Sequence, residues 1–324
     1  SHRTRTARLV AFWILATLFL GFAPGGDAFA QTCTASMTNM AFGSFNPLTG
    51  AKSTSATLSV NCTGTQNKVV RFCVSAAGTD QTGCRSMVSF STQLAFGLYT
   101  NAAHTVSLGD YRGGGSCPSG SWGATGLQFN LTLNATGSGS TTKTIYAGLN
   151  DATAVPGSYT ANYSGSNINV DYVYNTGAAC PVTAPKSVQP AFNISATVQA
   201  ACTVNATNMN FGSLTLLNAD VDETSTITAQ CTNSTPFNIG LNTGNGSGAT
   251  VSARKMTSGT KTIIYSLYQN AARTTVWGNT VGTDTASGIG IGANQSLTVF
   301  GRVPPQVTPE PATYTDTIIV TITY

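Results

Sequence analysis

Charged residues are scarce in this sequence. Asp, Glu, Lys and Arg make up 8% of its 324 residues, which argues against coiled coils and long surface helices, since both depend on Glu and Lys. Glycine is abundant instead, with 34 residues, and no window of 11 or more residues after position 30 keeps a helical apolar period. The composition therefore favours a β-rich chain.

Hydrophobic runs long enough to cross a bilayer are also lacking. The longest run, 9–22, has 14 residues, whereas a spanning helix needs about 20. Arginines precede this run, and Ala28 and Ala30 supply the small residues that a signal peptidase reads. We therefore predict a signal peptide over 1–30 and export through the periplasm to the cell surface. The alternative, a buried N-terminal helix, fits these flanking residues less well.

A strong net charge is lacking once this segment is removed. The full sequence carries +4, and 12 basic and 10 acidic side chains remain after position 30, so no nucleic-acid partner is predicted. His104 is then the single histidine, and although composition alone leaves a Ser-His-Asp arrangement open, nothing marks a nucleophile. The carboxylates Asp220, Asp222 and Glu223 lack a second set of ligands and are interpreted as a polar turn. We expect no enzymatic activity and no cofactor.

The eight cysteines show no C-x-x-C cluster of the kind that structural zinc requires. In an exported chain they favour disulfide bonds. Cys33 and Cys62 are 29 positions apart, as are Cys202 and Cys231, which predicts two equivalent bonds. Four cysteines remain: Cys73, Cys84, Cys117 and Cys180. They allow three pairings, of which we prefer Cys73 with Cys84 across a hairpin and Cys117 with Cys180 between two loops.

The sequence repeats itself at an offset of 169. CTASMTNMAFGSFN at 33–46 matches CTVNATNMNFGSLT at 202–215, and LYTNAAHTVSLGD at 98–110 matches LYQNAARTTVWGN at 267–279. PGSYT in the first copy also matches PATYT in the second, at a smaller offset, because the first copy carries an insertion between residues 110 and 143. The chain therefore contains two copies of one fold.

Each copy reads as a series of half-buried strands. Runs such as Leu127–Leu133 and Val320–Tyr324 alternate apolar and polar residues, with Gly-rich turns between the runs. We predict an all-β fold of two immunoglobulin-like antiparallel β-sandwich domains in tandem. The expected N-terminal domain spans 31–190, a linker strand spans 191–200, and the C-terminal domain spans 201–324.

The repeated motifs resemble the spore coat protein U domain, the module of Csu-type, archaic chaperone-usher pili. The resemblance rests on a cysteine followed by N-M-x-F-G-S-[FL], a second cysteine, LYxNAAxT and a terminal PxxYxD-type strand, and it covers nearly all of 33–324. It implies a sandwich that lacks its last strand, is held by a periplasmic chaperone, passes an outer-membrane usher and is completed by an extension of the adjacent subunit. A tandem of two such domains resembles the tip adhesin of these pili.

One segment has the pattern of a completing strand. Between 191 and 199, four apolar residues alternate with polar ones: Phe192, Ile194, Ala196 and Val198. We expect this segment to fold back and complete the first domain. Burying the four side chains would contribute about 5 to 9 kcal/mol before the ordering entropy is subtracted.

The second domain shows no such segment, so we expect its groove to need a strand from an adjacent subunit. The sequence reaches Tyr324 in a strand that also contains Val320 and Ile322 and matches 170–174 of the first domain. Cleavage before Gln31 leaves two residues ahead of Cys33, too few to donate a strand. A subunit that accepts a strand and cannot give one is expected at the pilus tip.

The end of the first domain that carries Cys33 and Cys62 is expected to face outward, together with the loops 62–68 and 175–190. The loops near this end and in the insertion are apolar and suggest contact residues: Tyr111, Pro118, Trp122, Ala179, Pro181, Val182 and Pro185. Rigid apolar loops suit attachment to an abiotic or cell surface and biofilm formation. Two alternatives remain, a lectin-like tip with a pocket around Trp122 and Tyr111 and a static spore or cell coat protein.

Overall fold

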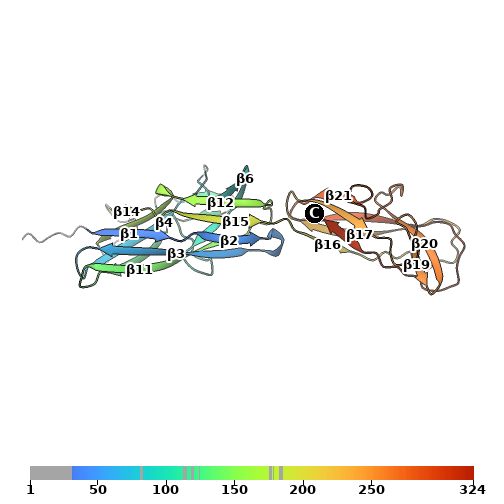
Figure 1. Ribbon diagram of the computed structural model, residues 1–324, viewed down its shortest axis with the longest axis horizontal. Coiled ribbons are helices and arrows are strands. Elements are labelled where there is room, and N and C mark those ends of the chain that lie inside the picture. Colours follow the sequence, from blue (N-terminus) through green and yellow to red (C-terminus); the bar gives the residue numbers. More distant parts are fainter. Residues whose placement is uncertain are drawn as a thin grey trace, which may run out of the picture.

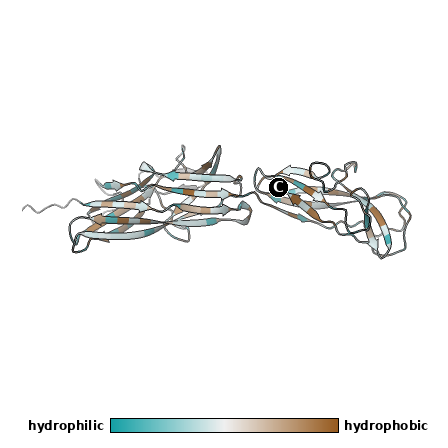
Figure 2. Ribbon diagram, viewed as in Figure 1, coloured by the Kyte–Doolittle hydropathy of each residue, from teal (hydrophilic) through white to brown (hydrophobic). Residues whose placement is uncertain are grey.

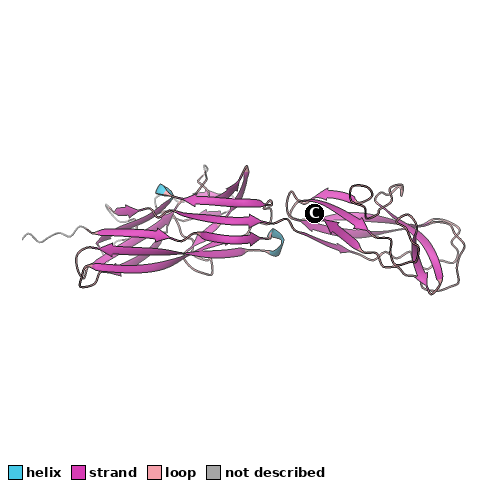
Figure 3. Cartoon of the chain, viewed as in Figure 1, coloured by secondary structure: helices cyan, strands magenta, loops and turns pink. Residues whose placement is uncertain are grey.

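The structure, a computed structural model, describes residues 31–80, 83–111, 115–117, 120–123, 125–174, 177, 179–181 and 185–324. The predicted signal peptide, 1–30, lies outside the described residues. Within them the ordered elements are strands and two short 3-10 helices (Figure 3). None of the described helices is long and apolar enough to cross a membrane.

The strands form two elongated bodies that lie end to end (Figure 1). Strands β1 to β15 form domain 1 and strands β16 to β23 form domain 2, and each body buries a hydrophobic cluster of its own. Apolar residues recur along the strands of both bodies (Figure 2), as expected for sheets with one buried face. The predicted all-β fold with two tandem sandwich domains is confirmed.

Domain 1 contains three sheets of four or five strands. The first sheet has the order β1, β3, β11, β7, with bounds Thr32–Met37, Lys52–Thr63, Ser138–Leu149 and Gly97–Tyr99. The second has the order β10, β4, β13, β14, with bounds Leu127–Thr132, Val69–Ala76, Ile168–Tyr174 and Lys186–Val188. The third has the order β2, β15, β12, β5, β6, with bounds Met40–Phe45, Phe192–Val198, Gly157–Tyr163, Ser86–Ser89 and Thr92–Ala95.

The last strands of domain 1 form one long hairpin across two of these sheets. The 3-10 helix η2 (Gly165–Asn167) separates β12 from β13, while the other 3-10 helix, η1 (Pro47–Thr49), follows β2. Strand β14 pairs with β13, and β15 pairs with β12, both antiparallel. Strand β15 thus lies inside a sheet, between β12 and β2.

Domain 2 repeats this plan with fewer strands. Its first sheet has the order β16, β17, β22, β20, β19, with bounds Cys202–Ala206, Val221–Cys231, Asn294–Val303, Lys261–Tyr268 and Arg254–Ser258. Its second sheet has the order β21, β18, β23, with bounds Ala286–Ile289, Pro236–Leu241 and Val320–Thr323. Among the described residues, no third sheet corresponds to the one that holds β15 in domain 1.

The insertion in domain 1 contains a small hairpin, β8 (Gly115–Cys117) with β9 (Gly120–Trp122). Its base is held where Gly109 N donates to Thr125 O at 2.7 Å and Asp110 N donates to Gly123 O at 3.1 Å. Ala76 N, at the end of β4, donates in turn to Gly109 O. The insertion therefore leaves domain 1 beside the end of β4.

Disulfide bonds join Cys33 to Cys62 and Cys202 to Cys231, each pair on neighbouring strands. Both predicted bonds are therefore present. The preferred pairing of the other cysteines is wrong, because Cys73 is bonded to Cys180. A bond from Cys73 to Cys84 assumed a hairpin of β4 with β5, but β4 pairs with β10 and β13 while β5 belongs to another sheet.

The bond of Cys73 with Cys180 also rules out the predicted bond between Cys117 and Cys180. The loop after β13 folds back over its neighbour β4, where Asp171 lies opposite Cys73. Cys84 is disulfide-bonded as well. The side chain of Cys117 lies outside the described residues.

A buried arginine occupies the same repeat position in both domains. Arg85 and Arg254, 169 positions apart, are 1% and 0% exposed. Arg85 Nη2 donates to Leu108 O at 2.6 Å, and Arg254 Nη2 donates to the matching carbonyl of Trp277 at 2.6 Å. Burial lowers the pKa of each guanidinium, and the carbonyl bonds offset part of the cost of burying the charge.

The joint between the domains is short and hydrogen-bonded. Thr232, fully buried, donates its backbone N–H to Ala201 O at 2.9 Å, and its hydroxyl accepts from Ala201 N at 3.1 Å. Asn233 Nδ2 donates to Thr153 O of domain 1 at 2.9 Å. The first two bonds fix the start of domain 2, and the third joins domain 2 to domain 1.

Candidate functional site

The first candidate site is the part of domain 2 that corresponds to the surroundings of β15. In domain 1, β15 runs parallel to β2 and antiparallel to β12. The matching segments of domain 2 are 209–214 and 314–318. In domain 2 the described residues form no strand between these two segments.

The alignment of these segments is supported by one bridge that both domains share. In domain 1, Thr160 of β12 lies opposite Val88 of β5. In domain 2, the equivalent residues Thr315 and Thr257 form an isolated bridge, with Thr257 N donating to Thr315 O at 2.8 Å. The segment 314–318 therefore keeps the position of β12, with its other edge unpaired within the described chain.

Repeat-equivalent apolar residues are buried in domain 1 and more exposed in domain 2. Met40, Phe42 and Phe45 of β2 are 0%, 3% and 2% exposed. Their counterparts in domain 2 are Met209 and Phe211, both half-buried, and Leu214, which is 41% exposed. On the opposite side, buried Tyr159 and Tyr163 correspond to half-buried Tyr314 and Ile318.

An apolar floor connects the two sides of this groove. Gly301 lies against Met209, and a side chain at position 301 would collide with the Met209 sulfur. Phe211 meets Tyr265 edge to face, with ring centroids 6.1 Å apart. The Tyr265 hydroxyl donates to Asp316 Oδ2 at 2.8 Å. Burial is the main cause that raises the pKa of Tyr265, and this hydrogen bond is the second.

The predicted acceptor residues of the last strand adjoin this groove. Val320 and Ile322 are half-buried against the domain 2 core, and Tyr324 is 58% exposed. Strand β23 pairs with β18 on one side, whereas its counterpart β13 pairs with strands on both sides. The groove, defined as 209–214, 314–318 and β23, combines apolar side chains with unpaired strand edges, which is the chemistry that accepts an added strand.

The second candidate site is the outer pole, the end of domain 1 away from domain 2 (Figure 1). Here Thr65 N donates to the Tyr174 hydroxyl at 2.8 Å. This bond joins the loop 62–68 to the start of the loop 175–190, two loops that were expected at the same end of the domain. Gly64 N donates to Gly137 O at 2.8 Å. The turn after β10 therefore belongs to this pole, although sequence reasoning missed it, and positive φ at Gly137 marks it as a tight turn.

The predicted contact residues divide into three groups. Ala179, Pro181 and Pro185 are exposed, and the bond from Cys180 to Cys73 anchors their loop. Tyr111 is half-buried, with its hydroxyl 2.7 Å from Asp171 Oδ2 and 2.9 Å from Cys73 O, so it anchors the insertion rather than reaching outward. Outside the described residues lie Pro118, Val182 and the side chain of Trp122.

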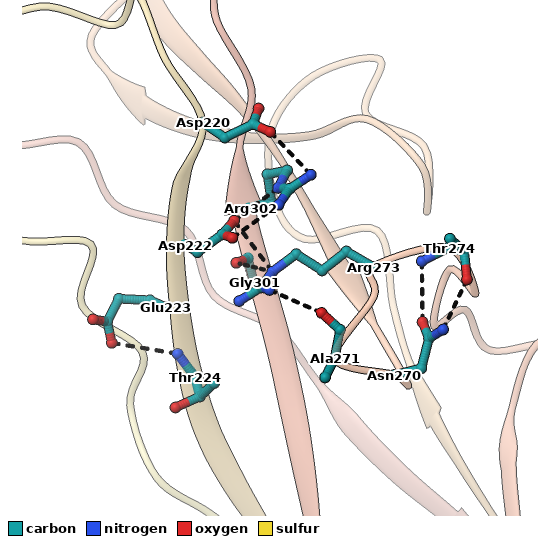
Figure 4. Close-up of polar contacts among 10 residues, drawn as sticks. All are labelled: Asp220, Asp222, Glu223, Thr224, Asn270, Ala271, Arg273, Thr274, Gly301 and Arg302. Atoms are coloured by element: carbon teal, nitrogen blue, oxygen red, sulfur yellow. Dashed lines mark hydrogen bonds and ion pairs between the residues drawn. The ribbon is translucent and has the colours of Figure 1, made fainter.

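The acidic cluster of domain 2 lies mostly on a strand, not in the predicted polar turn. Asp222 of β17 is opposite Arg302 of β22, with Arg302 Nε and Nη2 at 2.7 and 2.8 Å from its two oxygens (Figure 4). Arg302 also pairs with Asp220 at 2.9 Å, and Arg273 approaches Asp222 at 3.2 Å. The hydrogen bond from Arg302 lowers the pKa of Asp222. The two aspartates are thus paired with arginines. The described residues contain no group of acidic, His and Cys side chains suited to a metal ion.

His104 is a half-buried turn residue. It has a positive φ of 56° and stacks on Tyr99 with ring centroids 4.7 Å apart. Its repeat counterpart Arg273 has nearly the same φ, 54°. An open hollow of about 1090 Å³ lies beside Tyr99 and His104, and Lys52 and Asp151 are among its lining residues. Tyr111, around which a lectin-like tip would have its pocket, does not line this hollow.

Comparison with known proteins gives matches over both domains. The profile of the Spore Coat Protein U domain matches residues 25–164 and 188–321. Protein U of Myxococcus xanthus is 32% identical over 148 residues, which cover 41% of this chain and 82% of that protein.

Two solved structures are similar over most of the chain. One is from the CsuC–CsuE chaperone–tip adhesion subunit pre-assembly complex of archaic chaperone-usher Csu pili of Acinetobacter baumannii, with 17% identity, 90% of this chain and 100% of that chain covered, and a TM-score of 0.48. The other is the CupB6 tip adhesin of Pseudomonas aeruginosa, with 12% identity, 91% and 95% covered, and a TM-score of 0.35.

Proposed function

The chain belongs to the Spore Coat Protein U domain family, and from that premise we propose that it is a pilus tip subunit. Domain 2 accepts a strand from the adjacent subunit, and domain 1 is displayed at the end of the fibre, where it attaches the cell to a surface. A periplasmic chaperone holds domain 2 before assembly, and an outer-membrane usher passes the subunit to the exterior.

The observation that carries this proposal is the contrast between the two copies of one fold. Strand β15 lies beside β2 in domain 1, where Met40, Phe42 and Phe45 are buried, whereas in domain 2 Phe211 is half-buried and Leu214 is exposed. Apolar side chains beside unpaired strand edges are unfavourable in water. A complementary strand would both bury the side chains and supply the missing main-chain hydrogen bonds.

The geometry of β15 also describes the strand that domain 2 requires. That strand would run parallel to 209–214 and antiparallel to 314–318, with apolar residues at alternate positions facing the groove. β15 itself satisfies this rule, because Phe192, Ile194, Ala196 and Val198 are all buried at 4% exposure or less. The donor would thus come from the next subunit as an extended segment of about seven to ten residues.

The tip position rests on two features of domain 1. β15 fills its groove from within the same chain, so domain 1 has no need of a donor. Cleavage after Ala30 would leave Gln31 and Thr32 ahead of the disulfide-bonded Cys33, too short a segment to complete a neighbour. The chain then accepts one strand and gives none, which ends a head-to-tail polymer.

Attachment is assigned to the outer pole because the described residues around Cys180 are exposed and their loop is tethered. Ala179, Pro181 and Pro185 are exposed, and the Cys73–Cys180 bond limits the freedom of their loop. A loop that is already ordered loses less entropy when it binds. Contact with an apolar abiotic or cell surface and support of biofilm formation follow from this arrangement, and the role is adhesive rather than catalytic.

The test is cross-linking mass spectrometry on fibres isolated from cells that produce this chain. We expect cross-links from 209–214 and 314–318 to an extended segment of another subunit. Phe211→Asp should abolish these cross-links and the incorporation of the chain. Asn210→Asp, at an exposed position of the same segment, is the matched control and should incorporate normally. Fibres that incorporate Phe211→Asp as well as the control would refute the acceptor role.

A further inference from the structure

The hairpin of β5 and β6 presents an aromatic residue in an unusual way. Ser89 and Thr92 close the hairpin, and its two turn residues are Phe90 and Ser91. Phe90 has a positive φ of 51° and is the most exposed large apolar residue described, at 107%. Positive φ at the first of two turn residues is the II′ pattern, a position that prefers glycine.

Domain 2 has glycine at this position. Its hairpin of β19 and β20 is closed by Ser258 and Lys261, which match Ser89 and Thr92 at the repeat offset of 169. The first turn residue is therefore Gly259, with a φ of 57°. The first residue of both turns has a positive φ, and domain 1 places a bulky side chain at this position where domain 2 has glycine.

Phe90 is unfavourable in the isolated chain for two separate reasons. An L-residue with a bulky side chain is strained in the left-handed region, and a fully exposed phenyl ring orders water without making contacts. Since the ring is fully exposed, no packing within the described chain offsets either cost. A strained and exposed residue of this kind points to a role in contact with something outside the chain.

The base of the hairpin is rigid and uncharged. Thr92 Oγ1 donates to Ser89 O at 2.8 Å and lies 3.0 Å from the Tyr159 hydroxyl. Val88, two residues before Phe90, is 47% exposed, and 88–93 contains no charged residue. The hairpin therefore presents a small apolar projection on a fixed support, with little entropy left to lose on contact.

This projection is distinct from the outer pole. Val88 lies opposite Thr160 of β12, and Ser89 lies beside Gly157, which pairs with Val198 at the end of β15 next to domain 2. Figure 1 shows β6 projecting from the edge of domain 1 near domain 2. The hairpin is thus at the opposite end of domain 1 from the loops 62–68 and 175–190.

We propose that Phe90 is a lateral anchor that inserts into an apolar surface when the tip lies against it. The inference rests on the proposed attachment function and deepens it by naming a contact residue away from the outer pole. A flat hydrophobic surface is the favoured partner because the hairpin is convex, uncharged and carries one projecting ring, so it needs no shaped or charged counterpart. A second copy of this chain is the competing partner, and the test distinguishes it.

The test compares adsorption of the full chain and two variants to polystyrene beads. Phe90→Gly introduces the residue found in domain 2, and Phe90→Asn introduces a residue that tolerates positive φ. Each should weaken adsorption by about 5- to 20-fold, as expected for loss of one partly buried phenyl ring. The melting temperature of domain 1 should stay within about 2 °C or rise, because strain is relieved. Val106→Ser, at a 52% exposed position outside the hairpin, is the control and should change adsorption less than about 2-fold.

Several outcomes would overturn the inference. Equal adsorption of the wild type and both Phe90 variants would remove Phe90 as an anchor while leaving the attachment function in place. A lower melting temperature in both variants would make Phe90 a structural residue. Sedimentation of the wild type as a dimer and of Phe90→Gly as a monomer would assign the ring to self-association. A wild type that does not adsorb at all would instead refute the attachment function on which the inference rests.

Discussion

Ile194 of β15 lies beside Met40 of β2 in a parallel register, and both side chains are fully buried. The counterpart of Met40 in domain 2, Met209, is half-buried, and no described strand pairs with its segment. Within the described residues, the same fold thus occurs with a strand at this position in domain 1 and without one in domain 2. The difference between the two copies gives the following predictions.

Ile194→Ala should lower the free energy of unfolding of domain 1 by about 2 to 5 kcal/mol, because it leaves a cavity between β2 and β12. Ile194→Asp should be more severe, since an unpaired carboxylate would be buried. Calorimetry of the full chain measures the domain 1 transition. Thr197→Ala, on the exposed face of the same strand, should shift stability by less than about 0.5 kcal/mol. Equal effects of Ile194→Ala and Thr197→Ala would show that β15 does not complete the core.

Removing the Cys73–Cys180 bond by a double substitution to serine should destabilise domain 1 by about 3 to 5 kcal/mol. The bond closes a loop of 107 positions, and the chain-entropy model assigns large effects to long loops. Denaturant unfolding measures the loss, and proteolysis should detect a freer loop around Ala179. Unchanged stability and protease resistance would mean that β13 and β14 alone fix this loop.

Tyr265→Phe should destabilise domain 2 by about 1 to 2 kcal/mol, because it removes the hydroxyl that donates to Asp316. Asp316 still accepts hydrogen bonds from the backbone N–H groups of Asn245 and Thr317, which limits the loss of stability. Domain 1 has Phe96 at the matching position, so the phenyl ring fits this fold. Denaturant titration of the two proteins measures the difference, and equal midpoints would indicate that the hydroxyl bond adds nothing.

Asp222 should contribute a small, acid-sensitive part of domain 2 stability. Its pKa is lowered in the folded state by the hydrogen bond from Arg302, so its contribution is present above the ordinary value of about 3.9 and disappears as the pH falls through the lower folded value. The side chains of Arg302 and Asp222 are 30% and 37% exposed, which limits the effect of Asp222→Asn to about 1 kcal/mol or less.

Melting curves between about pH 6 and pH 2 test this dependence. The difference in melting temperature between wild type and Asp222→Asn should be largest at the neutral end of this range and decrease toward the acid end. It should also shrink in high salt, because exposed ion pairs are screened. A difference that grows as the pH falls would contradict the assignment.

Local sequence patterns predicted the completing strand and the equivalent disulfides. The alternation at Phe192 and Ile194 reports which residues share a face, and the equal spacing of Cys33–Cys62 and Cys202–Cys231 follows from one repeated pair of strands. Both signals are local to one strand or to neighbouring strands. They do not depend on how the sheets are arranged.

Features that depend on distant pairing were not predictable in this way. Cys180 reaches Cys73 because β13 lies next to β4, a neighbour far away in the sequence. The role of Tyr111 likewise depends on Asp171, 60 positions later. Two overlooked residues did leave a signal in the repeat, since Arg85 matches Arg254 and Phe90 falls opposite Gly259. Aligning the two copies is enough to detect a phenylalanine that replaces a turn glycine.

The most direct test of the account is amide hydrogen exchange across the groove of domain 2, measured in the isolated chain and in assembled fibres. We predict fast exchange for 209–214 and 314–318 in the isolated chain, with slow exchange in β15 and β12 under the same conditions. In fibres, 314–318 and its partner segment should become as protected as β12. Strong protection of both groove segments in the isolated chain would contradict the claim that domain 2 requires a strand from its neighbour.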